Sequence, residues 1–170
     1  MATPVFRAVR EALPDARINL LVRNKVAAVL RGSPWFSDRI VYDRSGGGRL
    51  RPFLNAVREL RAEPYDLALV LPNSFSSALM MRLGGADRIV GYARDMRSAL
   101  LTDVVRRLHE NGEFKPTYMA DYYLALCHAV GLSAVDRQTE LPFTGELAAR
   151  ARARLRSAGV EPDGPLALLH

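Results

Sequence analysis

Cysteine, lysine and long apolar runs are scarce in this sequence of 170 residues. The single cysteine, Cys127, cannot form an internal disulfide, and nothing else indicates an oxidising compartment. The longest apolar runs fall far short of the ~20 residues that a membrane-spanning helix needs. The first residues lack the basic and then apolar stretches of a secretory signal. We therefore expect a cytoplasmic protein.

Positive charge is in excess, and arginine supplies nearly all of it, because Lys25 and Lys115 are the only lysines. The formal net charge is +6 and the sequence pI is about 10.0. A basic surface suits an anionic partner such as nucleic acid, a membrane face or a phosphorylated substrate. Arginine in particular forms planar, two-point contacts with phosphate and carboxylate. A base-composition bias of the genome explains the same excess equally well, so charge alone does not choose a function.

Short strand-like apolar runs alternate with helical patterns along the whole chain. This alternation predicts an α/β fold in one domain, a Rossmann-like doubly wound parallel sheet with helices on both faces. The predicted strands are 18–22, 40–42, 67–71, 89–90 and 166–169. The predicted helices are 4–13, 26–30, 50–61, 74–83, 117–130 and 146–158.

Three local expectations accompany this pattern. Thr3 is expected to cap the first helix, with Pro4 at the first helical position. The run 67–71 is expected to be buried on both faces of the sheet. In the last helix an apolar arc is expected to pack, while the arginines outside it face solvent rather than nucleic acid or membrane. The arc consists of Leu147, Ala148, Ala151, Leu155 and Ala158.

No constellation of metal ligands or nucleophiles stands out. His109, His128 and His170 are far apart in sequence, and His109 lacks the second histidine that a helical zinc site needs. Cys127 has no evident activating partner, which favours a small core residue. The stretch 45–48, Ser-Gly-Gly-Gly, lacks the spacing of a phosphate-binding loop and favours a surface loop. We expect no metal and no cofactor.

Polar residues gather where the strand 67–71 gives way to a helix. Asn73, Ser74, Ser76 and Ser77 place amide and hydroxyl groups at the helix start, where free backbone N–H groups also point. Ligands of open α/β sheets bind at this carboxyl end of the strands. A simple serine N-cap explains the same residues equally well.

A second polar stretch follows the strand 89–90. It holds Tyr92, Arg94 and Arg97, and two arginines on one loop at a sheet end can bind phosphates or sugar carboxylates. The alternative is a solvated, charged loop. If both polar stretches serve one site, the candidate residues are Asn73, Ser74, Ser76, Tyr92, Arg94 and Arg97.

The sequence resembles the glycosyltransferase family 9 heptosyltransferases, most closely the ADP-heptose:lipopolysaccharide heptosyltransferase II type. Tyr65–Phe75, Tyr-Asp-Leu-Ala-Leu-Val-Leu-Pro-Asn-Ser-Phe, is the most specific segment. Each segment alone is a weak signal, whereas the ordered set is strong and covers essentially the whole chain. The other segments are Thr3–Ala8, Pro14–Ala16, Ser77–Leu79, Gly91-Tyr92 with Arg97, Leu100–Asp103 and Tyr122–Leu126.

The resemblance implies a GT-B enzyme of two Rossmann-like domains. The first domain binds the lipopolysaccharide inner core (Kdo and heptose on lipid A), and the second binds ADP-heptose. Heptose is transferred with inversion, with a carboxylate as general base, at the inner face of the cytoplasmic membrane. By position, the six candidate residues would line the acceptor side, with Arg94 and Arg97 facing anionic groups of the core.

Three departures from the family pattern shape the expectation for this chain. The family usually has a strand ending in Gly-Asp ahead of the segment that matches Met1–Pro4, and that aspartate is the proposed base. A lysine or arginine commonly stands at the position of Ser76. The family also continues beyond His170 into the donor domain, and 160–170 would begin the link to it. We expect residues 1–170 to form an incomplete acceptor-binding domain without a catalytic residue.

Other functions stay open. The chain can instead be a non-catalytic binding module for an anionic glycolipid or a nucleotide. A nucleic-acid-binding domain is disfavoured, because the aromatic residues fall among core positions and not among the arginine clusters. A domain that lacks its first strand should also associate through an exposed sheet edge.

Overall fold

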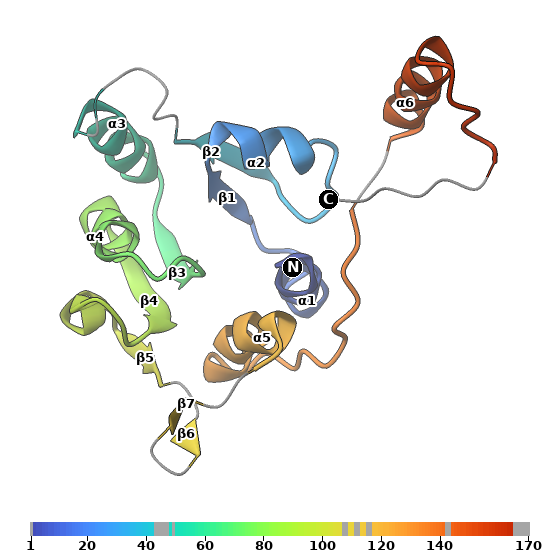
Figure 1. Ribbon diagram of the computed structural model, residues 1–170. Helices are drawn as coiled ribbons and strands as arrows, with labels where there is room; N and C mark the ends of the chain where they lie inside the picture. Colours follow the sequence, from blue (N-terminus) through green and yellow to red (C-terminus); the bar gives the residue numbers. More distant parts are fainter. Residues whose placement is uncertain are drawn as a thin grey trace.

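The fold was analysed in a computed structural model, which describes residues 2–42, 48, 50–106, 109–110, 113–114, 117–141 and 144–164. Within these residues five parallel strands form two separate sheets, ordered β1-β2 and β3-β4-β5, and β6 and β7 form a small antiparallel pair (Figure 1). The strands are β1 (Asn19–Val22), β2 (Asp38–Val41), β3 (Tyr65–Val70), β4 (Ala86–Tyr92), β5 (Asp103–Val105), β6 (His109–Glu110) and β7 (Glu113–Phe114).

Helices connect the parallel strands and pack in two pairs, α1 with α5 and α3 with α4 (Figure 1). Because α3, α4 and η1 each follow a parallel strand, their starts lie at the carboxyl edge of the sheets. The helices are α1 (Thr3–Ala12), α2 (Asn24–Val29), α3 (Leu50–Leu60), α4 (Phe75–Gly84), the 3-10 helix η1 (Arg97–Leu100), α5 (Met119–Ala129) and α6 (Gly145–Ser157).

Strand β3 lies between the two helix pairs. Leu67 and Leu69 pack with residues of α5, whereas Ala68 and Val70 pack with residues of α4. This alternation follows from the two-residue period of a strand and confirms that both faces of β3 are covered. Most of its residues are nevertheless only half-buried, because no described strand pairs with the β3 edge opposite β4.

Two expectations about the fold are wrong in detail. The parallel strands form two sheets instead of one, since β1 and β3 do not pair. Thr3 is the first residue of α1 and not its cap; Ala2 precedes the helix without a side-chain hydrogen bond. The Thr3 hydroxyl instead accepts a hydrogen bond from the backbone N–H of Glu140 at 3.1 Å. A contact between residues so distant in sequence overrides the local capping preference.

The packing expected for α6 is also wrong. None of its residues is buried, and Leu147, which belongs to the predicted apolar arc, is 41% exposed. The helix forms because Thr144 accepts a hydrogen bond from Leu147 N at 3.2 Å and caps it. Within the described residues no element buries the arc, so local sequence forms this helix without a packing partner.

The remaining helices and four of the predicted strands are confirmed within a few residues, whereas β5, β6, β7 and the 3-10 helix η1 were not predicted. Cys127 is buried in the core, as expected. The predicted strand 166–169 and most of the loop 45–48 lie outside the described residues, as do the side chains of His109 and His170. No helix in the described part of the chain is both long and apolar enough to cross a membrane.

Candidate functional site

The loop between β3 and α4 is held by its own serines. Ser74 is the N-cap of α4, and its hydroxyl accepts a hydrogen bond from the backbone N–H of Ser77 at 3.3 Å. The Ser77 hydroxyl donates to the carbonyl oxygens of Ser74 at 2.7 Å and Pro72 at 3.2 Å. The loop therefore has a defined shape before any ligand is present, and Ser76 stays exposed beside it.

The loop after β4 makes a tight turn before η1. The backbone N–H of Arg97 donates to the carbonyl oxygen of Arg94 at 3.1 Å. Asp95 and Met96 adopt left-handed φ values of 52° and 57°, which non-glycine residues rarely do. The turn must therefore be held from elsewhere, and Arg97 is the residue that holds it.

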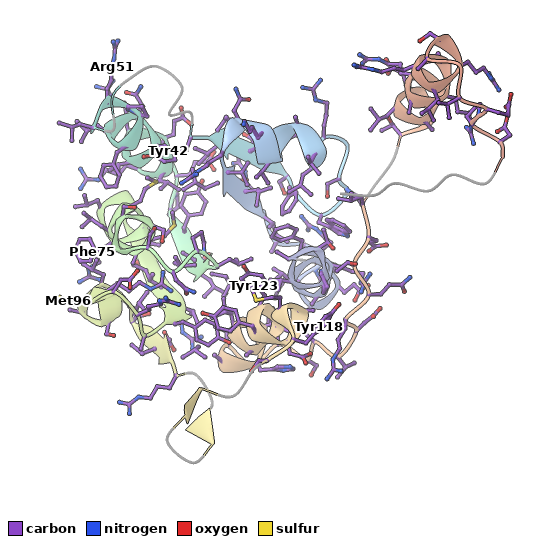
Figure 2. The ribbon with its side chains drawn as sticks, in the orientation of Figure 1. Tyr42, Arg51, Phe75, Met96, Tyr118 and Tyr123 are labelled. Atoms are coloured by element: carbon purple, nitrogen blue, oxygen red, sulfur yellow. The ribbon has the colours of Figure 1, made fainter. Side chains whose placement is uncertain are left out.

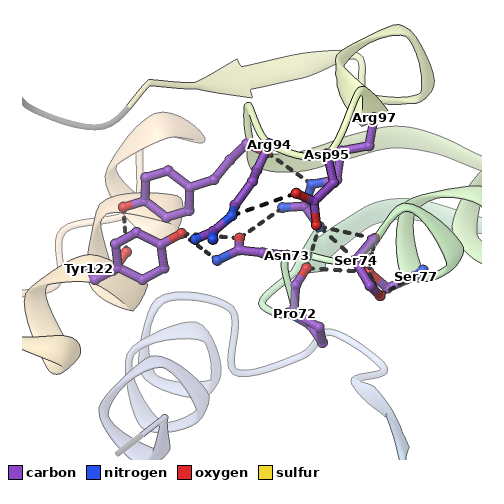
Figure 3. Close-up of polar contacts among 9 residues, drawn as sticks. Pro72, Asn73, Ser74, Ser77, Arg94, Asp95, Arg97 and Tyr122 are labelled. Atoms are coloured by element: carbon purple, nitrogen blue, oxygen red, sulfur yellow. Dashed lines mark hydrogen bonds and ion pairs between the residues drawn. The ribbon is translucent and has the colours of Figure 1, made fainter. Parts of the chain in front are cut away.

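Arg97 is fully buried and joins the two loops. Its Nε donates to the Tyr92 carbonyl at 2.9 Å, and its Nη2 donates to Asn73 Oδ1 at 3.2 Å. Its Nη1 donates to the Pro72 carbonyl and reaches the carbonyl of Ser74 at 3.5 Å. Figure 3 shows the guanidinium between the β3–α4 loop and the β4–η1 turn. Burial lowers the pKa of Arg97 from its ordinary value, and these acceptors compensate for the lost water.

Two stacked tyrosines link the same cluster to α5. The rings of Tyr92 and Tyr122 lie 3.9 Å apart at 8°, and the Tyr92 hydroxyl donates to the Tyr122 carbonyl. The Tyr122 hydroxyl is in turn hydrogen-bonded to Asn73, 2.8 Å from Nδ2 and 3.0 Å from Oδ1. Asn73 is thus fixed from two sides, by Tyr122 and by Arg97.

The groups that remain at the surface are polar and close together. Ser74, Ser76 and Arg94 are exposed beside the buried cluster. Arg94 Nε lies 3.6 Å from Asp95 Oδ1, and both side chains are about half exposed, at 51% and 56%. Such a loose surface pair is weak, so the Arg94 guanidinium can turn to another anion at little cost. The described residues contain no group of three or more His, Cys, Asp or Glu arranged to hold a metal ion.

The structure brings the six predicted residues into one neighbourhood, at the carboxyl ends of β3 and β4. Figure 3 labels Asn73, Ser74, Arg94 and Arg97 there. Their places within it differ. Ser74, Ser76 and Arg94 face outward, Asn73 is half-buried, and Tyr92 and Arg97 are buried. The hydrogen bonds that Arg97 donates among the described residues all go to protein oxygens. Arg94, in contrast, faces outward.

Sequence reasoning missed the role of Tyr122, and it noted the Ser77 hydroxyl at the helix start without including Ser77 among the six candidates. The sequence pattern placed Tyr122 only within the predicted helix 117–130, yet its hydroxyl is bonded to Asn73, 49 positions away. A tyrosine at a buried position signals a polar partner, because a buried hydroxyl needs one. The sequence contains that signal but does not identify the partner.

Known proteins resemble this chain over most of its length. The family model of glycosyltransferase family 9 (heptosyltransferase) matches residues 53–163. Lipopolysaccharide heptosyltransferase 2 of Escherichia coli (strain K12) is 32% identical over 147 residues, which are 84% of this chain and 40% of that protein. A second protein of that name, from Salmonella typhimurium, is 26% identical with the same coverage.

Two solved structures share the fold. A glycosyltransferase family 9 protein from Veillonella parvula superposes with a TM-score of 0.76 at 19% identity, covering 95% of this chain and 46% of that one. The E. coli ADP-heptose lipopolysaccharide heptosyltransferase II superposes with a TM-score of 0.64 at 22% identity, covering 96% and 48%. The chain thus spans less than half the length of these relatives. Since the family model matches more than half of the chain, the protein belongs to glycosyltransferase family 9.

Proposed function

We propose that this chain forms the acceptor-binding, amino-terminal half of a GT-B heptosyltransferase that builds the lipopolysaccharide inner core. The donor is ADP-L-glycero-D-manno-heptose, which a second domain binds. Heptose transfer takes place at the cytoplasmic face of the inner membrane. Family membership supports the reaction class. The observation that carries the acceptor role is the group of exposed Ser74, Ser76 and Arg94 at the carboxyl ends of two parallel strands, where open α/β sheets bind ligands.

The residues divide into contacting and positioning roles. Arg94 pairs with phosphate or sugar carboxylate of the acceptor, exchanging its weak partner Asp95 for a stronger, two-point anion. The hydroxyls of Ser74 and Ser76 bond to saccharide hydroxyls. Asn73 and Arg97 are positioning residues: Arg97 fixes both loops, and Asn73 is held between it and Tyr122.

The fold supports a further part of the proposal, a strand that completes the sheet between β1 and β3. The strands of both sheets are parallel within each sheet, and the core cluster of α3 and α4 includes Leu21 of β1 and Tyr65 of β3. Asn19 on β1 donates to the Tyr65 hydroxyl at 2.9 Å, while its Oδ1 is buried without a partner among the described residues. A strand leading into α1 would lie between β1 and β3 and pair with both edges. Its connection to β1 through α1 would be the usual right-handed crossover.

Calorimetric titration with a delipidated, phosphorylated inner-core oligosaccharide tests the acceptor role. We expect Arg94→Ala to weaken binding about tenfold, the loss typical of one hydrogen-bonded charged pair. Arg82→Ala is the matched control, because it removes the same charge from the opposite end of α4 and should leave affinity unchanged. Equal affinities for Arg94→Ala and the unaltered chain would remove the basis of the proposal.

A further inference from the structure

The start of α5 presents an aromatic ring to solvent. The structure describes all six tyrosines of the chain, and Tyr118 alone among them is exposed, at 61%. Figure 2 shows Tyr118 beside α5. Single exposed apolar side chains are common on protein surfaces, so the position of this ring decides what it can bind.

Tyr118 lies at the same sheet edge as the candidate site. Tyr122, one helical turn later, stacks on Tyr92 at the carboxyl end of β4, with ring centroids 3.9 Å apart. The Tyr122 hydroxyl is also 2.8 Å from Nδ2 of Asn73, in the loop that leaves β3. Residues four positions apart are neighbours on a helix surface. The exposed ring of Tyr118 therefore borders the cluster that holds Asn73.

The backbone that carries the Tyr118 ring is fixed. The Tyr118 carbonyl accepts a hydrogen bond from Tyr122 N at 3.0 Å, and Ala120, two positions along the chain, is buried. Tyr118 is the N-cap residue of α5, but its side chain makes no capping hydrogen bond. The ring thus starts from a defined place, and its removal takes no cap from the helix.

A saccharide offers two kinds of surface to such a site. Its hydroxyl and anionic substituents point outward around each pyranose ring, whereas the C–H groups form an apolar patch on the ring face. The exposed Ser74, Ser76 and Arg94 suit the polar substituents. The face of an aromatic ring is electron-rich and attracts positively polarised C–H groups, so a tyrosine beside these residues suits the apolar patch.

We propose that Tyr118 is a saccharide-binding residue whose ring stacks on the apolar face of a pyranose of the acceptor. The inference rests on the proposed function, because both concern the same ligand. It adds an aromatic contact from α5, which the polar contacts of the two loops do not require. Tyr122 is the positioning residue of this contact, since it fixes the start of α5 against Asn73 and Tyr92.

Calorimetric titration of Tyr118 variants with the delipidated, phosphorylated inner-core oligosaccharide tests the stacking. Tyr118→Phe keeps the ring and should bind within about twofold of the unaltered chain. Tyr118→Leu, which is apolar but not aromatic, and Tyr118→Ala should bind about fivefold more weakly, the loss typical of one aromatic contact. Val135→Ala, which shortens another exposed apolar side chain, 88% exposed, should leave affinity unchanged.

The dependence on salt separates stacking from charge. Stacking is not an interaction between two charges, so the fold-loss for Tyr118→Ala should be the same at low and at high salt. The fold-loss for Arg94→Ala should instead shrink as salt rises, because an exposed ion pair is screened. Unfolding midpoints by circular dichroism establish that each variant is folded.

The outcomes separate this inference from the proposed function. Unchanged affinity of Tyr118→Ala, with the loss for Arg94→Ala intact, would overturn the stacking and leave the acceptor proposal standing. A loss for Tyr118→Phe as large as that for Tyr118→Ala would assign the contact to the hydroxyl and would equally overturn the stacking. No binding of the oligosaccharide by the unaltered chain would overturn both.

Discussion

The Nη2 group of Arg97 donates to the side-chain oxygen of Asn73 across 3.2 Å, joining the first residue of η1 to the loop that leaves β3. The two residues are 24 positions apart in sequence, and Asn73 lies in the loop between β3 and α4, outside any helix or strand. One buried guanidinium thus joins the two loops into a single rigid unit. The positions of the exposed Ser74, Ser76 and Arg94 depend on this unit.

Arg97→Met should destabilise the loops of the site rather than remove a direct contact with a ligand. The change removes the hydrogen bonds that Arg97 donates to the carbonyls of Tyr92 and Pro72 and to Asn73, and the loss of a donor at a buried polar group costs about 1–3 kcal/mol. We expect the free energy of unfolding in urea to fall by about 2–4 kcal/mol on that basis. Arg94→Ala, on the exposed side of the same turn, should change it by less than about 0.5 kcal/mol. Similar losses for both variants would contradict the division of roles.

Ser74→Ala should destabilise α4 through the loss of its cap. The hydroxyl accepts from Ser77 N at the helix start, and removing such a cap typically costs ~1 kcal/mol. Ser76→Ala, two positions later and exposed, should have an effect of only a few tenths of a kcal/mol. Chemical denaturation of both variants measures the difference, and a larger loss for Ser76→Ala would be inconsistent with the observed cap.

Gly84→Ala should be destabilising although alanine is the better helix former. A Cβ at Gly84 would lie 2.8 Å from Leu60 Cβ and 3.0 Å from Leu60 Cδ1, so α3 and α4 would have to move apart. Overpacking of this kind costs about 1–3 kcal/mol. Gly145→Ala at the start of α6 meets nothing within 4 Å and should be neutral or slightly stabilising. Thermal unfolding of the pair decides whether the close approach is real.

Cys127 should be unreactive towards thiol reagents at pH 8 until the chain unfolds. Burial raises the pKa of its thiol from 9.0 to about 11. Since the folded pKa lies above the unfolded one, this contribution to stability is complete below pH 9 and is lost as pH rises towards 11. Labelling should therefore follow unfolding in a urea series, and Cys127→Ala should flatten the decline in stability between these pH values. Rapid labelling of the native chain would refute the buried position.

The unpaired edges of β1 and β3 should make the chain self-associate. Each strand pairs on one side only within the described residues, and exposed edges of parallel strands offer free backbone groups to another chain. Light scattering after size-exclusion chromatography should show a mass that rises with protein concentration. A single monomer peak over a hundredfold range of concentration would show that the edges are protected.

The sequence predicted what local physics controls. The serine cap at Ser74 and the helix end at Gly85, whose φ is 85°, follow from residues a few positions apart. Hydrophobic periodicity located α5 and β3 because each pattern covers a whole element. Grouping the polar stretches at one sheet edge required only that both follow parallel strands.

Long-range contacts decided the rest. Arg97 and Arg94 are equivalent in a sequence pattern, and only tertiary structure buries the first and exposes the second. Thr3 loses its capping role to a bond with Glu140 N. The division into two sheets depends on whether β1 and β3 meet, which no local pattern encodes. The three-residue strand β5 is too short to have a period of its own.

Hydrogen–deuterium exchange with a phosphorylated inner-core oligosaccharide tests most directly whether the acceptor binds at the carboxyl ends of β3 and β4. Peptides that cover residues 72–77 and 92–97 should exchange more slowly when the saccharide is present, and Arg94→Ala should abolish the protection. Peptides from α6 and from 134–141 serve as internal references and should not change. Protection confined to those reference segments, or none at saturating saccharide, would contradict the account.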